Sequence, residues 1–482
     1  MPTPVRFSES IEPLVRFVEE TPRDQILDST LARLRAGVPV ETMLTASALA
    51  VARSSDLPPG HHGGPLHPLA GLHAILHLSR RLTGEQRFLP ILQHVALSNK
   101  HIHDPVTGPY AMLEFTPLDA GGAEATKAAF LKAASRGESN KADHLFQWLW
   151  ANIPPIEAFD LLLSVAIPKN AVDDHYFIFP AFTWRALEQF GTEYRPFLMR
   201  PAVRYVARFP TQRAVPEIDA LIERHGLLGR VLRQRSGDDE TATIGAIGEA
   251  IGRCDAYAEV PALLAEALGG GLSLEGAGEA LSIGAAGLFL RSLTGNPMDV
   301  HLHTSANLRR YLLRLDGITP RNKLGILLMW HTGPEVKSTQ YRMDPPGASD
   351  LAGLPARDQP ALLEAIARSI HEQPPTDWSK VTNLGTMRAV PEVKETIALA
   401  RHYVACGYDP AALFARLGEI VCHDSFTEMH AFKHHQAAFE EFHATRAPWR
   451  DLHLVAAAQA AAISFGKNME VFEAALDLLH AA

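Results

Sequence analysis

The chain of 482 residues has a globular composition, with 46% hydrophobic and 21% charged residues, and a formal net charge of −9 at pH 7. This composition excludes disordered and fibrous proteins, and the acidic balance argues against a general nucleic-acid binder, which needs a basic face. The sequence does not open with a basic segment followed by an apolar one, and it has no run of about 18 apolar residues, so we expect neither a signal peptide nor a membrane span.

Helical spacing dominates the chain from its first third to its end. Apolar residues recur at i, i+3 and i+4, the pattern of amphipathic helices, in residues 27–34, 125–134, 144–150, 215–228, 262–268, 308–315, 362–370 and 393–406. Tyr176 to Phe182 is the best strand candidate, but Pro180 interrupts it and the following WRALEQF favours a helix start. The stretch LSIGAAGLFL from Leu281 predicts a buried helix. We therefore predict an all-α, multi-helix fold, for which solenoid-like helical hairpins around a central metal site are one arrangement.

Composition also predicts how the chain is organised. A Ser/Gly/Asp patch near residue 238 predicts an N-terminal helical lobe of residues 1–238 and a C-terminal helical lobe of residues 239–482, which together form one catalytic unit. The loop 332–355, rich in Gly, Pro, Asp and Ser, predicts an active-site lid. The basic residues from Arg200 to Arg213 alternate with apolar ones and predict a solvated helix surface.

The three cysteines are too few for a disulfide framework or a cysteine zinc site, and none forms a CxxC pair. They are Cys254, Cys406 and Cys422, and they fit a reducing, cytoplasmic setting. The glycine string at 245–252 lacks a preceding strand, so it indicates helix packing rather than nucleotide binding. The composition leaves monomer and homodimer as equal alternatives.

Histidine is the unusual residue of the composition, with 23 copies that cluster along the chain. The first cluster, HHGGPLHPLAGLHAILHL, contains His61, His62, His67, His73 and His77. His73 and His77 are four residues apart and share one helix face, as the ligands of metal-binding helices do. His67 lies near the entrance of this helix. For each of these imidazoles, a hydrogen-bonded structural role is the alternative.

Three more groups lie in the middle of the chain. His101 and His103 would share one face of a strand but lie about 200° apart on a helix, so at most one of them serves any single site. His175 follows Asp173 and Asp174, either of which can orient its second ring nitrogen. The third group is HLH at 301–303, where the next two residues, Thr and Ser, predict the start of a helix.

The last cluster, CHDSFTEMHAFKHHQAAFEEFH, carries the most information. Ser425 and Glu428 predict a capping box, and the helix then places His430 and Lys433 three residues apart on one face. Lys433 is either exposed on an amphipathic helix or buried and kept neutral by desolvation. A neutral lysine amine adds carbon dioxide to give a carbamate, an anionic oxygen ligand that suits iron(II) in combination with neutral imidazoles.

These motifs, in this order, resemble the pattern of the questin oxidase-like superfamily, which includes fungal enzymes that oxidise or cleave anthraquinone-type polyketides and uncharacterised bacterial proteins. The matching features are an early histidine cluster, His175 before Trp184 and Arg185, an HxxT formed by His301 and Thr304, and an HxxK formed by His430 and Lys433. Pro and Gly interrupt the early cluster, unlike the denser histidine run of the family, so His67 and His73 are alternatives for the first ligand.

The resemblance implies an α-helical, mononuclear non-haem iron(II) oxygenase that uses O2 to oxidise or cleave a phenolic or quinone-type aromatic polyketide. Its implied metal ligands are His67, His175, His301, His430 and a carboxylated Lys433. If Lys433 is not carboxylated, His434 is the substitute ligand. An external reductant such as NADPH is left open.

Two residues are candidates for catalysis beside the metal. His331, next to the long loop, is a candidate acid or base. Tyr176 is the second, and the aromatic residues that are candidates for a flat apolar pocket are Tyr176, Phe177, Phe179, Trp330 and Trp378.

Two other classes of function compete with the oxygenase. A zinc hydrolase with a carbamate-bridged metal pair uses an HxH motif on a strand of a β/α barrel, which HIH at 101–103 and HLH at 301–303 mimic, although the alternating β/α pattern is missing. A non-catalytic helical scaffold predicts no bound metal and no convergence of distant histidines.

Overall fold

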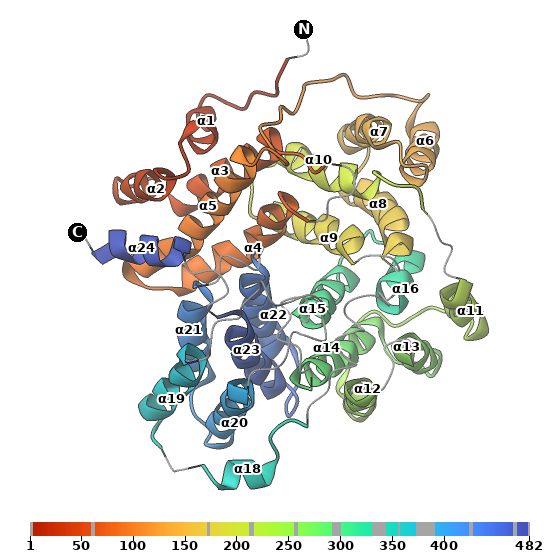
Figure 1. Ribbon diagram of the computed structural model, residues 1–482. Coiled ribbons are helices and arrows are strands. Elements are labelled where there is room, and N and C mark those ends of the chain that lie inside the picture. Colours follow the sequence, from red (N-terminus) through yellow and green to blue (C-terminus); the bar gives the residue numbers. More distant parts are fainter. Residues whose placement is uncertain are drawn as a thin grey trace. The chain divides into compact units, whose positions relative to one another are not determined.

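The computed structural model describes residues 3–58, 63–170, 174–211, 216–254, 259–291, 300–329, 344–354, 357–372, 391–423, 428–465 and 470–480. Within these residues the elements are helices, and the β pairing is limited to two isolated bridges, Pro4 with Leu113 and Arg136 with Pro210 (Figure 1). The prediction of an all-α, multi-helix fold is confirmed.

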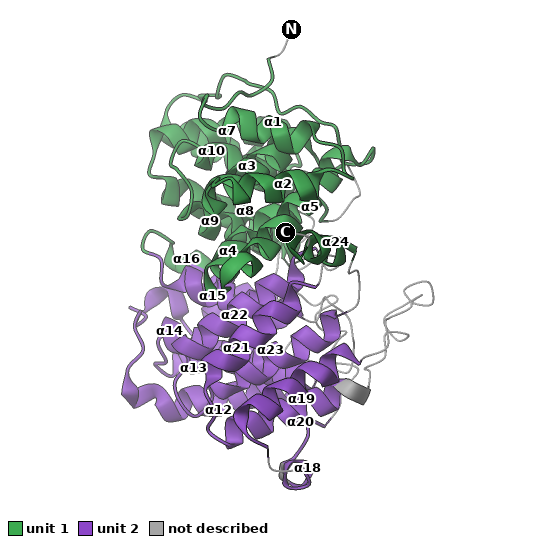
Figure 2. Cartoon of the chain, turned by 90° about the vertical axis from the view of Figure 1, so that its left-hand side faces the viewer, with its two compact units in different colours: residues 1–215, 316–322, 470–482 green, residues 216–315, 323–469 purple. Residues whose placement is uncertain are grey.

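The chain divides into two compact units, each described by itself (Figure 2). Unit 1 comprises residues 1–215, 316–322 and 470–482, and unit 2 comprises residues 216–315 and 323–469. Composition placed the division after residue 238. In the structure, residues 216–238 belong to unit 2. Residues 470–482 belong to unit 1, because the helix in this segment packs against helices of that unit.

Unit 1 contains eleven of the described helices. They are α1 (Glu12–Glu20), α2 (Ile26–Arg35), α3 (Val40–Ser54), α4 (Leu66–Arg81), α5 (Leu89–His103), α6 (Ala123–Ser135), α7 (Ser139–Asn152), α8 (Pro155–Lys169), α9 (His175–Leu187), α10 (Arg195–Val206) and α24 (Glu470–His480), with a short 3-10 helix, η1 (Gly84–Phe88). Helices α3, α4, α5, α9 and α10 pack on one another and form the centre of the unit. The boundary between the units at residue 322 falls inside α16 (Pro320–Leu328).

Unit 2 is built around α14, α15, α22 and α23, which pack side by side (Figure 1). Its described helices are α11 (Pro216–Arg224), α12 (Thr241–Arg253), α13 (Glu259–Gly269), α14 (Leu274–Leu290), α15 (His301–Leu313), α18 (Ala348–Ala352), α19 (Gln359–His371), α20 (Pro391–Ala405), α21 (Pro410–Val421), α22 (His430–Ala444) and α23 (Asp451–Ser464), with the 3-10 helices η2 (Leu227–Gly229) and η3 (Asp238–Glu240). The buried helix predicted from Leu281 is the second half of α14, and the glycine string at 245–252 lies on α12.

The glycines of α12 and α14 allow these two helices to approach closely. A Cβ added at Gly252 would lie 3.6 Å from Cα of Gly287, and one added at Gly284 would overlap Ile251. The helix-packing interpretation of the glycine string is therefore confirmed.

The histidine-bearing helices are buried on nearly every side. In α4, the residues from Leu66 to Leu76 are all buried, and in α22 those from His430 to Ala438 are all buried. A helix that is surrounded by protein has no solvent face, so its polar side chains must find partners in the interior. We therefore expect the functional histidines of this protein to lie in the cores of the two units.

Two predicted helix starts are wrong. Thr304 and Ser305 were expected to begin a helix, but α15 begins at His301, and the hydroxyl of Thr304 donates a hydrogen bond to the carbonyl of Val300 inside the first turn. Glu428 was expected inside the first turn of the last histidine helix, but α22 begins at His430, after it. Ser425, its predicted capping partner, lies outside the described residues.

The arginines from Arg200 to Arg208 do not form the solvated surface that their pattern predicted, and Arg213 lies outside the described residues. Arg200 is buried and donates a 3.0 Å hydrogen bond from Nε to Oδ2 of Asp143, which is also buried. Burial raises the pKa of Asp143, and the neighbouring arginines act against this increase. Because Asp143 lies 57 residues earlier in the chain, the spacing of the arginines gives no sign of this partner.

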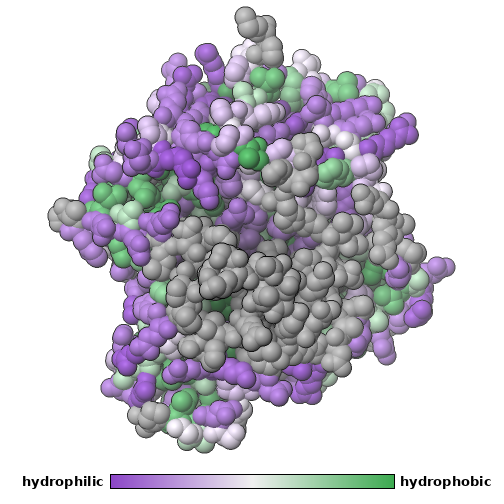
Figure 3. Space-filling view, in the orientation of Figure 1, coloured by the Kyte–Doolittle hydropathy of each residue, from purple (hydrophilic) through white to green (hydrophobic). Residues whose placement is uncertain are grey.

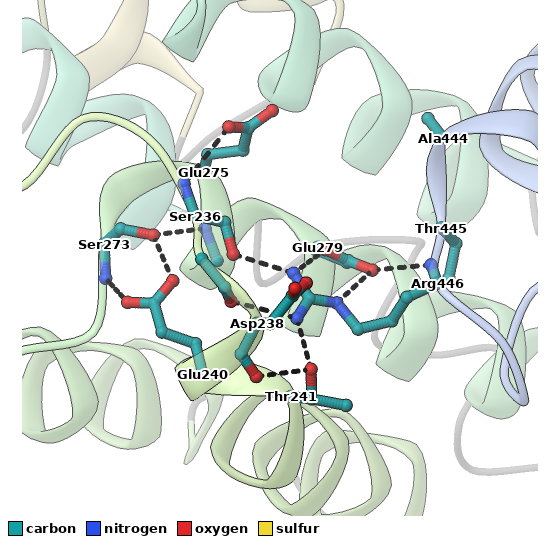
Figure 4. Close-up of polar contacts among 12 residues, drawn as sticks. Ser236, Asp238, Glu240, Thr241, Ser273, Glu275, Glu279, Ala444, Thr445 and Arg446 are labelled. Carbon is teal, nitrogen blue, oxygen red and sulfur yellow. Dashed lines mark hydrogen bonds and ion pairs between the residues drawn. The ribbon is translucent and has the colours of Figure 1, made fainter.

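A polar cluster fixes the segment after α22 to the beginnings of α12 and α14 (Figure 4). Arg446 donates from Nε and Nη2 to the carboxylate of Glu279, at 3.1 Å each, and from Nη1 to the hydroxyl of Thr241 at 2.7 Å. Beside it, Glu240 accepts hydrogen bonds from the backbone amide and the hydroxyl of Ser273, the N-cap residue of α14. These contacts join three helices of unit 2 at one end of its core.

Hydrophilic residues cover most of the described surface in the view of Figure 3, and apolar residues form small separate patches. The large apolar side chains exposed among the described residues are Val106, Tyr110, Leu113, Leu118, Leu228 and Val231. Among these same residues, no helix combines the length and the apolar character that a membrane crossing requires.

Candidate metal centre

In unit 1, His67 and His175 form a buried pair. His67 lies in the first turn of α4, and His175 is the first residue of α9. Their ring centroids lie 5.4 Å apart with the ring planes nearly perpendicular. Phe179, one turn further along α9, contacts both imidazoles, with centroid distances of 5.1 Å to His67 and 4.7 Å to His175. Both imidazoles are buried. A metal ion binds the neutral form of an imidazole.

The two candidates for the first ligand have different neighbours. His67 contacts His175, whereas the ring of His73 lies 4.4 Å from that of His77, its neighbour one turn along α4. The residues His61 and His62, which open the same sequence cluster, lie outside the described residues. Within unit 1, His67 is therefore the member of the early cluster that the fold brings to the mid-chain histidine.

In unit 2, His301 and His430 face one another through their Nε2 atoms. Each is the first residue of its helix, α15 and α22 respectively. The two Nε2 atoms lie 2.7 Å apart, and the rings are stacked at 25°. Two nitrogens bound to one metal at about 2.0–2.1 Å and at right angles would be about 2.9 Å apart. The observed 2.7 Å is slightly shorter than this and is also the length of a short hydrogen bond.

The backbone leading into α22 is strained. Glu428 and Met429 have positive φ values of 47° and 71°, which non-glycine residues rarely adopt. Such conformations cost about 1–3 kcal/mol each and persist where the surrounding fold imposes them, often at functional sites. Here they set the direction from which His430 enters the core.

Lys433 is buried, so of the two alternatives, exposed and buried, the structure has the second. Desolvation lowers its pKa from 10.5 to about 7, and the charge of Glu428 acts against this decrease. A substantial share of the side chain is therefore the neutral amine near pH 7, which is the form that adds carbon dioxide. It lies three residues after His430, on the same side of α22.

A second set of histidines forms a hydrogen-bonded chain in the core of unit 2. Nε2 of His434 lies 3.1 Å from Nδ1 of His303, and Nε2 of His303 lies 2.8 Å from Nδ1 of His453. Nε2 of His453 then lies 3.1 Å from the hydroxyl of Thr445. All three imidazoles are fully buried, and burial lowers the pKa of His303 to about 4.

This chain ends on a buried ion pair. Arg310 donates from Nη1 to the hydroxyl of Thr445 at 3.0 Å and to Oε2 of Glu441 at 2.6 Å. Glu441 also accepts hydrogen bonds from Ser282 and Asn307. No sequence motif predicted this network. Its only signal was the presence of charged residues in segments that are otherwise apolar.

His434, the predicted substitute ligand, takes part in this network through one ring nitrogen. Its Nε2 atom is hydrogen-bonded to His303, whereas its buried Nδ1 atom has no hydrogen-bond partner among the described residues. His303 and His453 use both ring nitrogens in the network.

Other histidines are structural too. His94 is hydrogen-bonded to the hydroxyl of Ser47 and the carbonyl of Pro68, and burial lowers its pKa to about 4. His101 is buried while His103 is exposed, as expected for residues that lie on opposite sides of helix α5. The HIH and HLH motifs both lie on helices, so neither forms the strand motif of the hydrolase barrel.

Some of the remaining predicted residues lie within the described ranges and others do not. Tyr176 lies on α9, buried, with its ring 5.1 Å from that of Tyr205. Phe177 and Phe179 are buried on the same helix. His331, Trp330, Trp378 and Asp173 lie outside the described residues, as does most of the loop predicted to be a lid.

The comparisons with known proteins add no further assignment. No family model, no curated protein and no solved structure matches the chain.

Proposed function

We propose that this chain is a mononuclear non-haem iron(II) oxygenase that oxidises or cleaves an electron-rich phenolic or quinone-type aromatic compound with O2. The observation that carries the proposal is the approach of the Nε2 atoms of His301 and His430 to 2.7 Å, with buried Lys433 one turn along the same helix. Two nitrogen donors and a potential anionic oxygen donor thus occur together in the core of unit 2.

The proposed donor set fits a divalent iron. In the ligand set that the resemblance implies, the imidazoles of His67, His175, His301 and His430 would supply borderline nitrogen donors, and a carbamate on Lys433 would supply a single negative charge. The burial of Lys433 supports the carbamate, because its lowered pKa provides the neutral amine from which a carbamate forms. When bound, iron(II) would supply the one-electron chemistry that allows O2 to react with an aromatic ring.

The described residues suggest how the protein contributes beyond holding the ion. Phe179 packs on both imidazoles of the unit 1 pair, which restrains their orientation and excludes water from them. Tyr176, on the preceding turn of α9, is proposed to contact the aromatic substrate. His331 remains a proposed acid or base for moving the phenolic proton.

Several parts of the proposal rest on sequence alone. The substrate class and the oxygenase chemistry follow from the resemblance to the questin oxidase-like superfamily. The cytoplasmic location rests on the cysteine pattern, and an external reductant such as NADPH is required only if the substrate does not supply all the electrons. A monomer and a homodimer are equally compatible with the proposal.

Oxygen consumption tests the proposal. Protein loaded with iron(II) under anaerobic conditions is mixed with aerated buffer and a panel of hydroquinones, anthraquinones and their reduced forms, in the presence and absence of NADPH. The proposal predicts substrate-dependent O2 uptake that requires iron and that is lost in His301→Ala. Uptake that is equal with iron and with zinc would contradict the redox role.

A zinc hydrolase receives no support from a specific observation, since HIH and HLH both lie on helices. The scaffold alternative predicts no convergence of distant histidines, whereas His301 and His430, 129 residues apart, approach to 2.7 Å. It also predicts no metal in the purified protein, a result that metal analysis distinguishes directly.

A further inference from the structure

Unit 1 contains a cavity of about 190 Å³ between the end of α3, the start of α4 and the end of α10. Its apolar wall includes Val51, Leu66 and Leu69, and its polar wall includes Arg204 and Arg208. For comparison, an apolar cavity of about 150 Å³ accommodates benzene. The space therefore suits a body of about one aromatic ring.

Three arginines follow one another at four-residue intervals along this side of α10 and just beyond it. The first two have carboxylate partners: Arg200 pairs with Asp143, and Arg204 pairs with Asp56, each at 3.0 Å. Arg208 has no carboxylate partner among the described residues, and its buried Nε and Nη1 atoms donate no hydrogen bond there. A buried donor without an acceptor is costly, and most so when it is charged.

The ring contact that Arg208 makes does not use its N–H donors. Its guanidinium carbon lies 4.2 Å from the ring centroid of Tyr205, a cation–π contact that supports the side chain from one face. The in-plane N–H groups, which bind anions, are not used by this contact. Tyr205 also lines the cavity, so the two side chains form one corner of it.

Capping of α10 does not explain Arg208. A cation after a helix C-terminus usually interacts with the last carbonyls. Here that role belongs to Lys169, whose Nζ donates hydrogen bonds to the carbonyls of Val206 and Phe209. Arg208 is thus a second cation at a helix end that is already capped.

We propose that this cavity binds a small organic carboxylate, with its carboxylate on Arg208 and its apolar body against Val51, Leu66 and Leu69. Arg204 and Asp56 compensate one another, so Arg208 leaves one positive charge for one negative charge of the ligand. Ser139, the first residue of α7, also lines the cavity and places the positive end of that helix beside it. Inorganic phosphate fits less well, because the side chains of Val51, Leu66 and Leu69 offer it no hydrogen bond. The proposal does not depend on the iron site.

Isothermal titration of the full chain tests the proposal, with benzoate as the probe and benzyl alcohol as its uncharged counterpart. Titration extends to about 10 mM, since the loss of free motion limits the affinity of so small a ligand. We expect saturable benzoate binding, and binding of benzyl alcohol or of benzoate to Arg208→Gln that is weaker by at least about tenfold. Arg230→Gln, which changes an exposed arginine, is the matched control and should bind as the wild type does.

A second variant keeps the test decisive if Arg208→Gln fails to fold. Leu57→Trp, at a half-buried loop position on the cavity wall, fills part of the space and should block benzoate while leaving Arg208 in place. No benzoate binding by the wild type would overturn the proposal. Equal binding of benzyl alcohol, or phosphate binding without benzoate binding, would also overturn it.

Discussion

The Nε2 atoms of His301 and His430 lie 2.7 Å apart although 129 residues separate them in the sequence. Such a contact either shares one proton between two neutral rings or brings two ligands to one metal ion. Unit 2 offers a direct comparison, because His434, His303 and His453 form contacts of the first kind and end on Thr445. Substitutions at these histidines and at the charged groups beside them distinguish a hydrogen-bonded histidine from one that binds a metal.

The first prediction concerns Lys433 and pH. Its pKa is lowered from 10.5 to about 7 by burial, so between these pH values the unfolded chain binds more protons than the folded one. The free energy of unfolding therefore rises with pH over this window, and the stability is lost as the pH falls toward 7. We compare the free energies of unfolding of Lys433→Met and of the wild type in metal-free, CO2-depleted protein. The amount by which the variant is the more stable should decrease by roughly 3 kcal/mol between pH 7 and pH 9.5.

Urea unfolding at the two pH values measures this difference. Lys141→Met is the matched control, because Lys141 is exposed on α7 and should give no such dependence. A Lys433→Met advantage that is the same at both pH values would mean that Lys433 titrates normally, and the proposed carbamate would lose its chemical basis.

His434→Ala tests the substitute ligand. We expect this variant to keep the wild-type iron content, because the Nε2 atom of His434 is hydrogen-bonded to His303. Its free energy of unfolding should fall by about 2–4 kcal/mol, since a buried hydrogen bond is lost and a cavity is left. Metal analysis and urea unfolding of the same preparation give both values. A folded variant without iron would instead identify His434 as a ligand.

Glu441→Gln tests the ion pair at the end of the histidine chain. Burial raises the pKa of Glu441, but Arg310 and the other partners outweigh this and hold it at about 2. The stabilisation is therefore present above the ordinary value of 4.5 and is lost as the pH falls through 2. At pH 7 the substitution leaves buried Arg310 with Glu279, whose Oε2 lies 3.5 Å from Nη2, as its remaining carboxylate partner, and it should cost about 2–3 kcal/mol.

The cost of Glu441→Gln should decrease when unfolding is measured at pH 3 instead of pH 7. Glu249→Gln, an exposed position on α12, is the control and should change stability by less than about 0.5 kcal/mol. If both substitutions have similar small effects, the network does not stabilise unit 2.

Gly284→Ala tests the close packing of α14 on α12. Alanine is normally the better helix former, but an added Cβ would overlap Ile251 and lie 3.1 Å from the carbonyl oxygen of Gly248. We expect a loss of about 1–3 kcal/mol from overpacking. Gly287→Ala, whose added Cβ would lie 3.3 Å from Cα of Gly252, should cost less. Thermal unfolding compares the two, and a stabilised Gly284→Ala would contradict the packing.

The fold class could be predicted from the sequence because apolar spacing is a local property. Each predicted helical segment overlaps a helix, although some, such as 215–228 and 308–315, extend beyond the ends of their helices, α11 and α15, and Tyr176 to Phe182 lies in α9. The helix starts at His301 and His430 could not be predicted, because these helices are buried and their ends depend on distant contacts rather than on capping side chains.

The candidate site could be predicted only within each sequence motif. The spacing of His430 and Lys433 indicated a shared helix face, and the structure has Lys433 buried. The partnership of His303 with His434 and His453 joins three helices, and that of Arg200 with Asp143 joins two. Such pairs depend on tertiary packing, which a single sequence does not encode in any local pattern.

Metal analysis tests the central claim most directly. The wild type, His430→Ala, Lys433→Ala and the control His443→Ala, an exposed histidine of α22, are purified anaerobically from iron-replete cells and analysed by elemental mass spectrometry. The account predicts about one iron per chain in the wild type and in His443→Ala, and a loss of iron in the other two variants while circular dichroism shows a folded protein. A folded wild type without metal, or with iron retained in His430→Ala, would contradict it.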